Sequence, residues 1–523
     1  MAYHINQLPE VAFAHILCFL TAAELCKSVL GVCRHWHSAA ITCRRLWRIV
    51  RLQPTKMTNE TQWFNSCSEF VELNANTLVL LELDFSLLAM IPNVLVNTEP
   101  YAPERPTSFT GRIIMRSSLP QLRRLVIVDD QGFGLHSVTQ LVTAAANVTA
   151  LKASGCYRMC DQSLATIARG WPRLEQLSLD CGHEIGWVGL QRALNTLEPG
   201  HLRIVALDLS AICDRTAAVL FKRFASTLVE IELDAWRLTD DAVTLLVNGV
   251  LKTANQKSTS KVTGDGAGCG LNVGRLLPQR SPIDAVSLLR CEYISDASLA
   301  ELARLQLSTL RLSNGAKITA VGIINLASSA SISASLTFLE LRAMRDCDDR
   351  CVEQIAKHLQ LLEVLILPNC WAISSVGFQT VWCEMNRIKV FDIRGVELDA
   401  LATVFQRHPY GLPELRYLDI RFCETERSDH GRLFDSLKLS RKCSSDYDLL
   451  IAHSNNVYGQ SQLTRLVATT QRCDVVLSQA FGASLTDVNF EDYNFATIVA
   501  AELRKVAGRC TAVANYLRYG FRL

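Results

Sequence analysis

Acidic and arginine side chains recur two residues apart in the C-terminal half of this 523-residue chain. The pairs are Glu340 with Arg342, Asp392 with Arg394, and Asp419 with Arg421. In an extended strand, residues two apart share a face, so each pair would present a carboxylate beside a guanidinium group. Such a face can neutralise itself and stay solvated, or it can bind a charged partner, because a guanidinium group captures a carboxylate or phosphate in a bidentate manner. Both interpretations stay open for these pairs.

A second set of charged residues lacks compensating cations in its own positions. It is acidic and comprises Asp180, Asp208, Glu232 and Asp234. We expect this run to bind a basic segment of a partner protein. We expect the arginines further along the chain to bind acidic or phosphorylated groups, and these are Arg311, Arg342, Arg394 and Arg421. Together the two sets predict a polarised surface for binding a target protein.

A repeated apolar pattern, Leu-x-x-Leu-x-Leu, must position these charges. It begins at residues 122, 148, 174, 204 and 228, and resumes at 283, 307, 336, 362, 388 and 415. The starts at 122, 148 and 174 are 26 residues apart, as are those at 336, 362 and 388. At 204 the pattern takes Ile204, Leu207 and Leu209 as its apolar residues. This period and motif are typical of leucine-rich repeats, which stack strand, turn and return helix into a curved solenoid with a parallel concave sheet.

Two further features accompany the repeat. Return helices are expected at 163–169 and 241–250, and Ser295 before Asp296 is a typical helix cap. Cysteines stand eight residues after the first apolar residue of four repeats, at Cys156, Cys291, Cys370 and Cys423. A small thiol fits the interior turn at that position. These features resemble the cysteine-containing subclass of leucine-rich repeats.

Irregular segments flank and interrupt the array. Leu78, Leu81 and Leu83 are interpreted as a degenerate first repeat. Leu463 with Leu466, and the stretch 485–490, are interpreted as degenerate C-terminal repeats. The Pro-containing stretch 97–118 and the polar, Gly-rich stretch 253–281 break the period. The glycines of the second stretch lack the strand, turn and Lys-Ser/Thr of a phosphate loop, so we expect a flexible excursion.

The N-terminal stretch carries amphipathic helical patterns. Pro9 suits the first turn of a helix, and Glu10 complements the positive helix N-terminus. Apolar stripes follow over 13–20 and 25–36, and a third short helix would carry Leu46 and Trp47. So short a block cannot bury three such helices by itself, so part of its apolar surface is expected to meet a partner. The alternative is an ordinary helical hairpin that packs on its own domain.

This pattern resembles the F-box, the helical module that docks on the Skp-type linker protein of cullin-based SCF ubiquitin ligases. The matching residues that the resemblance assigns to linker docking are Leu8, Pro9, Ile16, Leu17, Leu20, Leu25, Val32, Cys33 and Trp36. Residues 21–24 depart from the usual Pro and Asp, although Thr21 and Glu24 keep the spacing of a capping box. His35 stands where a second Arg is frequent.

Composition excludes several other classes. A formal net charge of +2 argues against nucleic acid or membrane as the main partner. There is no signal-peptide pattern, and nineteen largely unpaired cysteines indicate a reducing compartment, cytoplasmic or nuclear. The pairs Cys156/Cys160 and Cys347/Cys351 lack a second pair or a His at matching distance, so a zinc site is disfavoured. No catalytic motif is present, and we expect no cofactor, no metal and no enzyme activity.

The sequence thus predicts an α/β protein with a three-helix F-box at 1–52. A linker with a degenerate first repeat follows at 53–121, then leucine-rich repeats at 122–436, and degenerate repeats or a cap at 437–523. The resemblance implies a non-catalytic substrate-recognition subunit of an SCF-type ligase, with a Skp-type linker, a cullin and an unknown target as partners. The alternative is a non-ligase leucine-rich-repeat scaffold or regulator. An extracellular receptor is disfavoured by the missing signal peptide and the unpaired cysteines.

Overall fold

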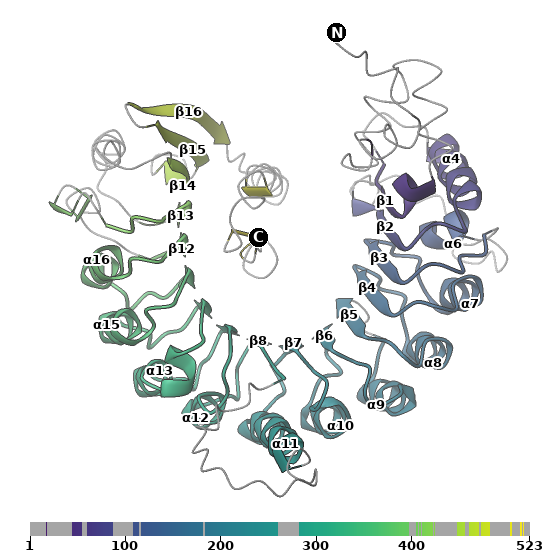
Figure 1. Cartoon of the computed structure of the whole chain (residues 1–523), viewed down its shortest axis with the longest axis horizontal. Coiled ribbons are helices and arrows are strands. Elements are labelled where there is room, and N and C mark those ends of the chain that lie inside the picture. The colour runs from purple at the N-terminus through teal and green to yellow at the C-terminus, as the bar shows by residue number, and fades with distance from the viewer. Residues whose placement is uncertain are drawn as a thin grey trace, which may run out of the picture. The chain divides into compact units, whose positions relative to one another are not determined.

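The computed structural model describes residues 17, 44–54, 60–86, 108–114, 117–180, 184–259, 282–396, 404–405, 407–408, 411–421, 423, 447–455, 460–469, 472–481, 503–504, 513–514 and 516. These residues belong to two units, Met1–Leu233 and Asp234–Leu523. In each unit, strands form one layer and helices form a second layer that covers one face of the strands (Figure 1).

The first unit alternates strands and helices. Its strands are β1 (Ile49–Leu52), β2 (Leu80–Asp84), β3 (Arg124–Val128), β4 (Ala150–Ser154), β5 (Gln176–Asp180), β6 (Ile204–Asp208) and β7 (Glu230–Asp234), whose last residue begins the second unit. Its helices are the 3₁₀ helix η3 (Arg44–Trp47) and the α-helices α4 (Glu60–Leu73), α6 (Phe109–Ile114), α7 (Leu135–Ala144), α8 (Asp161–Gly170), α9 (Trp187–Thr196) and α10 (Asp214–Phe224). Strands β1 to β7 pair in parallel and in chain order.

The second unit repeats this plan. Its parallel strands are β8 (Ala285–Leu289), β9 (Thr309–Ser313), β10 (Phe338–Arg342), β11 (Val364–Ile366), β12 (Val390–Asp392) and β13 (Tyr417–Ile420). Its helices are α11 (Asp240–Thr259), α12 (Asp296–Leu302), α13 (Ala320–Ala327), α14 (Ala330–Ser333), α15 (Asp349–His358) and α16 (Ser375–Glu384). Both units therefore confirm the prediction of an α/β leucine-rich-repeat solenoid with a parallel sheet.

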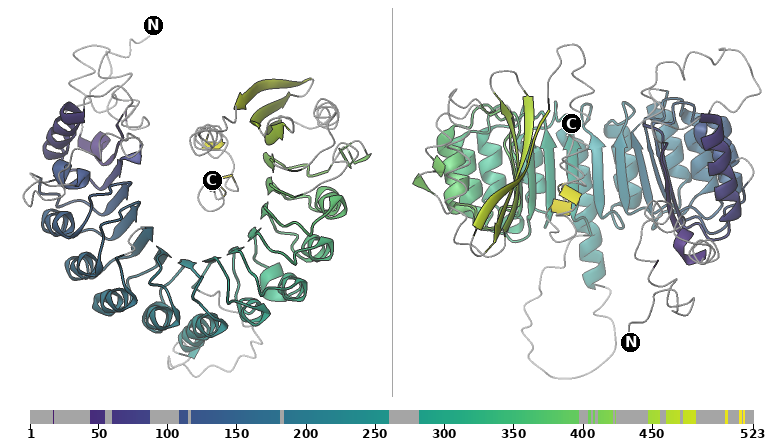
Figure 2. Two further views of the ribbon diagram at one scale, coloured as in Figure 1. Left: turned by 180° about the vertical axis from the view of Figure 1, so that it is seen from behind. Right: turned by 90° about the horizontal axis from the view of Figure 1, so that it is seen from above.

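A different pattern follows β13. Strand β14 (Tyr447–Asn455) still pairs in parallel with β13, but β15 (Gln460–Thr469) and β16 (Arg472–Phe481) turn antiparallel (Figure 2). Leu463 and Leu466 lie in β15, so they do not form the repeat strand that their spacing predicted. The spacing resembled the repeat because an antiparallel strand also alternates its side chains. The other expected C-terminal repeat, at 485–490, lies outside the described residues.

Alternating side chains explain the core. On β4, Leu151 and Ala153 are buried between sheet and helices, whereas Lys152 between them is exposed on the opposite, inner face. Leu78, Leu81 and Leu83, the residues of the expected degenerate repeat, are fully buried, and two of them lie on β2. The sheet already begins with β1, inside the segment 1–52 assigned to the F-box.

One repeat was placed in the wrong frame by two residues. The strand register sets Leu177 opposite Val205, and Leu179 opposite Leu207. The core residues of β6 are therefore Val205 and Leu207, whereas Ile204 is half-buried. The repeat preceding β6 is longer than its neighbours, and Leu207 can occupy either of two positions in the motif, so spacing alone could not fix the frame.

The helices are joined by a ladder of aspartates. Asp296 begins α12 and accepts hydrogen bonds from the amide (2.8 Å) and the hydroxyl (2.6 Å) of Thr319, the residue that caps α13. Asp349 of α15 does the same for Ser374, which caps α16, at 2.8 and 2.6 Å. A Cβ atom at Gly377 would collide with the Asp349 carboxylate, so this close approach requires glycine. In these two pairs of repeats the start of one helix thus fixes the start of the next.

Candidate functional site

The inner face of the first unit carries carboxylates on successive strands. Asp180 of β5 lies opposite Asp208 of β6, and Glu232 of β7 lies opposite Ala206. Asp180 is exposed, and Asp208 and Glu232 are half-buried. We call these three residues the acidic face. Their spacing predicted that they share this face, and the structure brings them onto neighbouring strands.

The acidic face also affects a residue that the sequence analysis missed. Burial raises the pKa of the Asp129 carboxyl, and the negative charges of Asp84 and Asp180 raise it further. Asp129 follows β3 in the left-handed backbone region, with φ of 56°. Asp84, Asp129 and Asp180 thus lie close enough on this side of the first unit for their charges to interact. For Asp129, the only signal in the sequence was a polar residue directly after a strand.

Asp234 differs from the acidic face. Its side chain is fully buried, and the Arg290 guanidinium donates to it from Nε at 2.8 Å. The sequence predicted Asp234 as part of the acidic run, because no cation occupies the neighbouring strand positions. The cation comes instead from the turn after β8, where Arg290 adopts a left-handed φ of 58°. In this structure Asp234 is therefore an internal partner of Arg290.

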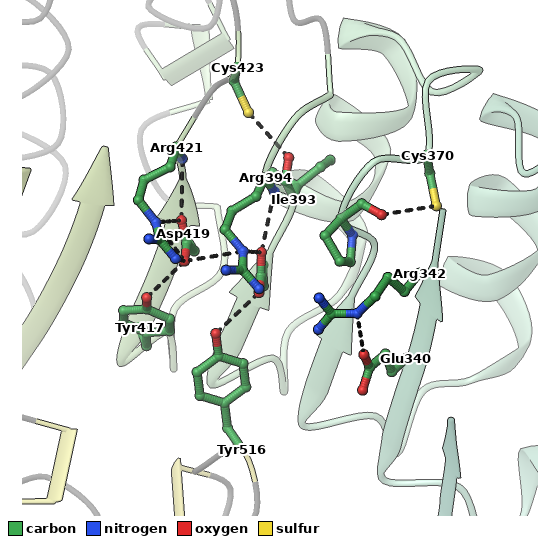
Figure 3. Close-up of polar contacts among 12 residues, drawn as sticks. Glu340, Arg342, Cys370, Ile393, Arg394, Tyr417, Asp419, Arg421, Cys423 and Tyr516 are labelled. Atoms are coloured by element: carbon green, nitrogen blue, oxygen red, sulfur yellow. Dashed lines mark hydrogen bonds and ion pairs between the residues drawn. The ribbon is translucent and has the colours of Figure 1, made fainter. Parts of the chain in front are cut away.

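The inner face of the second unit carries a layer of paired charges on strands β9, β10, β12 and β13 and on the residues that follow β12 and β13, and Figure 3 shows the part that begins at β10. Its members are Arg311, Glu340, Arg342, Asp392, Arg394, Asp419 and Arg421, and we call them the charged layer. Glu340 is the centre of its first part: Arg311 Nε donates to Oε2 at 2.8 Å and Arg342 Nε donates to Oε1 at 2.9 Å. One carboxylate thus bridges arginines of two neighbouring strands.

The second part of the charged layer lies on β12 and β13, with Arg394 and Arg421 just after these two strands. Arg394 Nε lies 3.0 Å from Asp392 Oδ1 and 3.5 Å from Asp419 Oδ2. Arg421 binds Asp419 twice, from Nε at 3.0 Å and from Nη2 at 2.8 Å. All three acid and arginine pairs expected from the sequence therefore form, and the layer extends them across strands.

Two tyrosines complete the second part of the layer. Tyr417 donates its hydroxyl to Asp419 Oδ2 at 2.9 Å, and Tyr516 donates its hydroxyl to Asp392 Oδ2 at 3.1 Å (Figure 3). The two rings lie 5.2 Å apart. Tyr516 is fully buried and comes from the C-terminal segment, 124 residues after its partner. Nothing in the sequence pointed to Tyr516, because no spacing relates it to the repeat.

Burial changes what the arginines can do. The sequence predicted that Arg311 and Arg421 lie on an accessible concave face, but only 1% and 7% of their side chains are exposed. Arg394 keeps 12% and Arg342 keeps 22%. Of the four arginines, Arg342 is therefore the most open to a partner.

The electrostatics of the charged layer follow from burial and pairing. Burial raises the pKa of the Glu340 carboxyl, but Arg311 and Arg342 lower it more, so that its pKa lies below the ordinary value. The pKa of Asp419 is lowered in the same way, since Arg421 and Arg394 outweigh burial. Burial keeps the pKa of Asp392 above its ordinary value despite Arg394. The layer is thus an ion-pair network in which, of its three carboxylates, burial outweighs the arginines at Asp392 alone.

The cysteines of the repeat are structural. Cys156, Cys291, Cys370 and Cys423 are buried, as predicted. Cys291 donates to the Leu288 carbonyl at 3.1 Å, and burial raises its thiol pKa to about 12. Such thiols are not nucleophilic at neutral pH. Across the described ranges, no group of three or more His, Cys, Asp or Glu residues could hold a metal ion.

Most of the predicted linker-docking residues lie outside the described residues. They are Leu8, Pro9, Ile16, Leu20, Leu25, Val32, Cys33 and Trp36. Leu17 is described: its backbone is helical and its side chain is buried. At the end of this stretch Leu46 and Trp47 are buried in η3, where the Trp47 ring meets Phe70 edge to face at 5.1 Å.

Comparison with known families identifies the N-terminal stretch. A family model described as F-box-like matches residues 5–53. The chain therefore carries an F-box-like domain ahead of a leucine-rich-repeat array, which is the arrangement of F-box/LRR proteins and confirms the prediction from the sequence. No curated protein matches the chain. In the part of the chain that the structure describes, no helix is both long and apolar enough to cross a bilayer.

Two solved structures share parts of the architecture. The yeast Rad7 and Elc1 complex has a chain that is 17% identical, with a TM-score of 0.41 over 60% of this chain and 79% of that chain. The TLR13–ssRNA13 complex has a chain that is 14% identical, with a TM-score of 0.35 over 75% of this chain and 48% of that chain. Both TM-scores are low, so neither likeness bears on what this chain does.

Proposed function

We propose that this protein is the target-recognition subunit of an SCF-type ubiquitin ligase. The observation that carries the proposal is the F-box-like match at residues 5–53, directly ahead of a repeat array. The F-box docks on a Skp-type linker protein and through it on a cullin, and the repeats hold the target for ubiquitination and degradation. The chain itself is non-catalytic. It acts by raising the local concentration of the target beside the conjugating enzyme.

The linker-docking surface consists of the residues that match the F-box pattern. Leu8 and Pro9 open the first helix of that pattern, and Trp36 closes the second. Burial of Leu17 supports the view that some of the matching residues hold the module together rather than contact the linker. We therefore assign the strongest docking role to Leu8 and Pro9.

The target-binding surface lies on the inner faces of the repeats. The acidic face of the first unit supports binding of a basic target segment, because Asp180, Asp208 and Glu232 are accessible and their negative charges add up. Such a surface accelerates association and makes it sensitive to salt. The proposal also places the protein in the cytoplasm or the nucleus, where the free thiols of its buried cysteines persist.

The test is affinity capture of the tagged full-length chain beside its double variant Leu8→Ala with Pro9→Ala, each followed by mass spectrometry. We expect the wild type to recover a Skp-type linker and a cullin, and the variant to lose both while it keeps target candidates. The double variant is preferable to deletion of residues 1–52, because that deletion removes β1, which pairs with β2 and buries Val50.

Capture without linker or cullin would contradict the ligase proposal. The solenoid would then serve as a scaffold or regulator, and its own partners would define the function. Retention of the linker by the double variant would leave the ligase role in place but would show that Leu8 and Pro9 are not the docking residues.

A further inference from the structure

Strand β11 interrupts the charged layer of the second unit. The strand register sets Glu340 of β10 opposite Ile366 of β11, and Ile366 opposite Asp392 of β12. Strands β10 and β12 therefore place a carboxylate in this position, whereas β11 places an apolar side chain. Two residues further on, β10 and β12 lead to Arg342 and Arg394, whereas β11 leads to Pro368. The alternation of acids and arginines thus has a gap above β11.

The arginines on either side of this gap have donors to spare. Arg342 binds Glu340 through Nε, and Arg394 binds Asp392 through Nε. Among the described residues, neither Arg342 nor Arg394 has a hydrogen-bond partner for Nη2, although both Nη2 atoms are buried. Buried donors in proteins are nearly always bonded, so two such donors flanking one strand indicate a place for an acceptor.

The charges of the layer point to the same kind of acceptor. The layer contains four guanidinium groups, from Arg311, Arg342, Arg394 and Arg421, and three carboxylates, from Glu340, Asp392 and Asp419. One positive charge is left over within the layer. A single carboxylate would balance it, whereas a phosphate group, with about −1.5 to −2 charges at neutral pH, would overcompensate.

The layer already shows the geometry that such a carboxylate would adopt. Glu340 bridges Arg311 and Arg342 from neighbouring strands, with one oxygen on each guanidinium group. A carboxylate above Ile366 would bridge Arg342 and Arg394 in the same way and would continue the alternation across β11. Arginine side chains are long enough to converge across the two strand spacings that separate β10 from β12.

We propose that Arg342 and Arg394 form a carboxylate-binding site above β11, and that its occupant is a Glu or Asp side chain from an acidic segment of the target protein. The inference rests on the proposed function, because it names the chemistry of one part of the target. Arg342 has the more exposed side chain, so the acidic segment enters from the side of β10. Tyr516, bound to Asp392, frames the opposite side of the site.

The first test needs no ligand and compares two full-length variants by thermal unfolding at neutral pH. Ile366→Glu places a carboxylate in the gap, and Ile366→Gln places a neutral side chain of the same shape there. We expect the Glu variant to unfold at the higher temperature, because both arginines then bond its carboxylate. A buried carboxylate without such partners is more costly than an amide, so a lower unfolding temperature for the Glu variant would overturn the site.

The same comparison in a variant without the two arginines tests whether they cause the difference. With Arg342→Gln and Arg394→Gln both present, the advantage of Glu over Gln at position 366 is expected to vanish, as in a double-mutant cycle. An advantage that persists without the arginines would come from another source and would also overturn the site.

The second test uses a fluorescein-labelled deca-glutamate peptide, with deca-glutamine as its uncharged counterpart, and fluorescence anisotropy on the full-length chain. We expect only the glutamate peptide to bind. Arg342→Gln or Arg394→Gln should each weaken binding about tenfold, the loss of one charge-assisted hydrogen bond. Ile366→Glu should abolish binding. Arg350→Gln is the control, because exposed Arg350 pairs with Asp348 next to α15, outside the layer.

Equal binding by the wild type and the two arginine variants would overturn the site. The outcome is separable from that of the proposed function, because neither test involves the linker or the cullin. A chain that captures no linker and still binds the glutamate peptide through Arg342 and Arg394 keeps the site and loses the ligase role. A chain that captures the linker but does not bind the glutamate peptide through these arginines keeps the ligase role and loses the site.

Discussion

The two units build their inner faces from the same repeat and use them differently. Glu232 in the first unit and Asp419 in the second occupy equivalent positions on their strands, yet Glu232 is half-buried and Asp419 is fully buried. Beside Asp419, the repeat supplies Arg421 two residues later. The repeat therefore sets the direction of a side chain, whereas the residues around that side chain determine how buried and how charged it is.

The difference defines two kinds of charged surface. Asp180, in the first unit, is exposed and accepts a hydrogen bond from Ser154 at 3.1 Å, and such a residue can exchange water for a partner at low cost. Asp392, in the second unit, is held by Arg394 and covered by Tyr516. Breaking such a pair inside the protein is costly, so the charged layer should contribute to stability more than the acidic face does.

The largest expected effect is a loss of stability when Glu340, the centre of the first part of the charged layer, loses an arginine partner. Arg311→Ala should lower the free energy of unfolding by about 3–5 kcal/mol, because it leaves the buried Glu340 carboxylate with half of its partners. Urea denaturation measures this. Arg173→Ala in the first unit is the control, since its pair with Glu198 is exposed and should be worth less than about 1 kcal/mol. An equal loss of unfolding free energy in both variants would show that the two units do not differ in this respect.

The next largest effect is a loss of stability when Tyr516, which covers Asp392, loses its hydroxyl. Tyr516→Phe removes the hydroxyl that bonds buried Asp392 and should cost about 1–3 kcal/mol of unfolding free energy, because one carboxylate oxygen loses its donor. Tyr293→Phe is the matched control, because Tyr293 is half-exposed and its ring contact with Lys317 survives the change. A Tyr516→Phe variant as stable as the wild type would show that the C-terminal segment does not contribute to the layer.

A third effect concerns binding and not stability. Asp208→Lys with Glu232→Lys should weaken association with a basic target about tenfold and should reduce its dependence on salt, because the attractive charges of the acidic face are reversed. Capture at two salt concentrations measures both quantities. Glu353→Lys with Glu384→Lys is the control, since it changes the net charge equally through exposed residues of α15 and α16. If the control variant lost as much affinity, the net charge of the chain and not the acidic face would explain the result.

The smallest expected effect is a loss of stability that occurs only in acid. The pKa of Glu340 in the folded state lies below its ordinary value of 4.5. Its ionised form therefore stabilises the fold above about pH 4.5, and this stabilisation is lost as the pH falls through the lowered pKa. Urea unfolding at several pH values should show a steeper acid loss for the wild type than for Glu340→Gln. Parallel profiles would show that the Glu340 carboxylate does not carry this dependence.

Much of the fold followed from local patterns. Apolar residues at a fixed period predicted strands β2 to β13 almost throughout, and the spacing of Cys291 and Cys370 predicted their burial. These predictions succeed because each repeat contacts only its neighbours, so the pattern within one repeat fixes the local structure. The frame of β6 was missed where the repeat length changes, and the antiparallel β15 was missed because alternation does not reveal strand direction.

The sequence by itself determined that the chain carries an F-box-like pattern, a parallel solenoid and acid and arginine residues on its inner face. The tertiary structure alone decided which of these charges are available. Arg290, which follows β8 beyond the polar insert, neutralises Asp234, and Tyr516, from a segment that no period connects to its partner, covers Asp392. Direction along a strand is a local property of the backbone, whereas burial and pairing depend on contacts between distant segments, and only the folded chain brings those segments together.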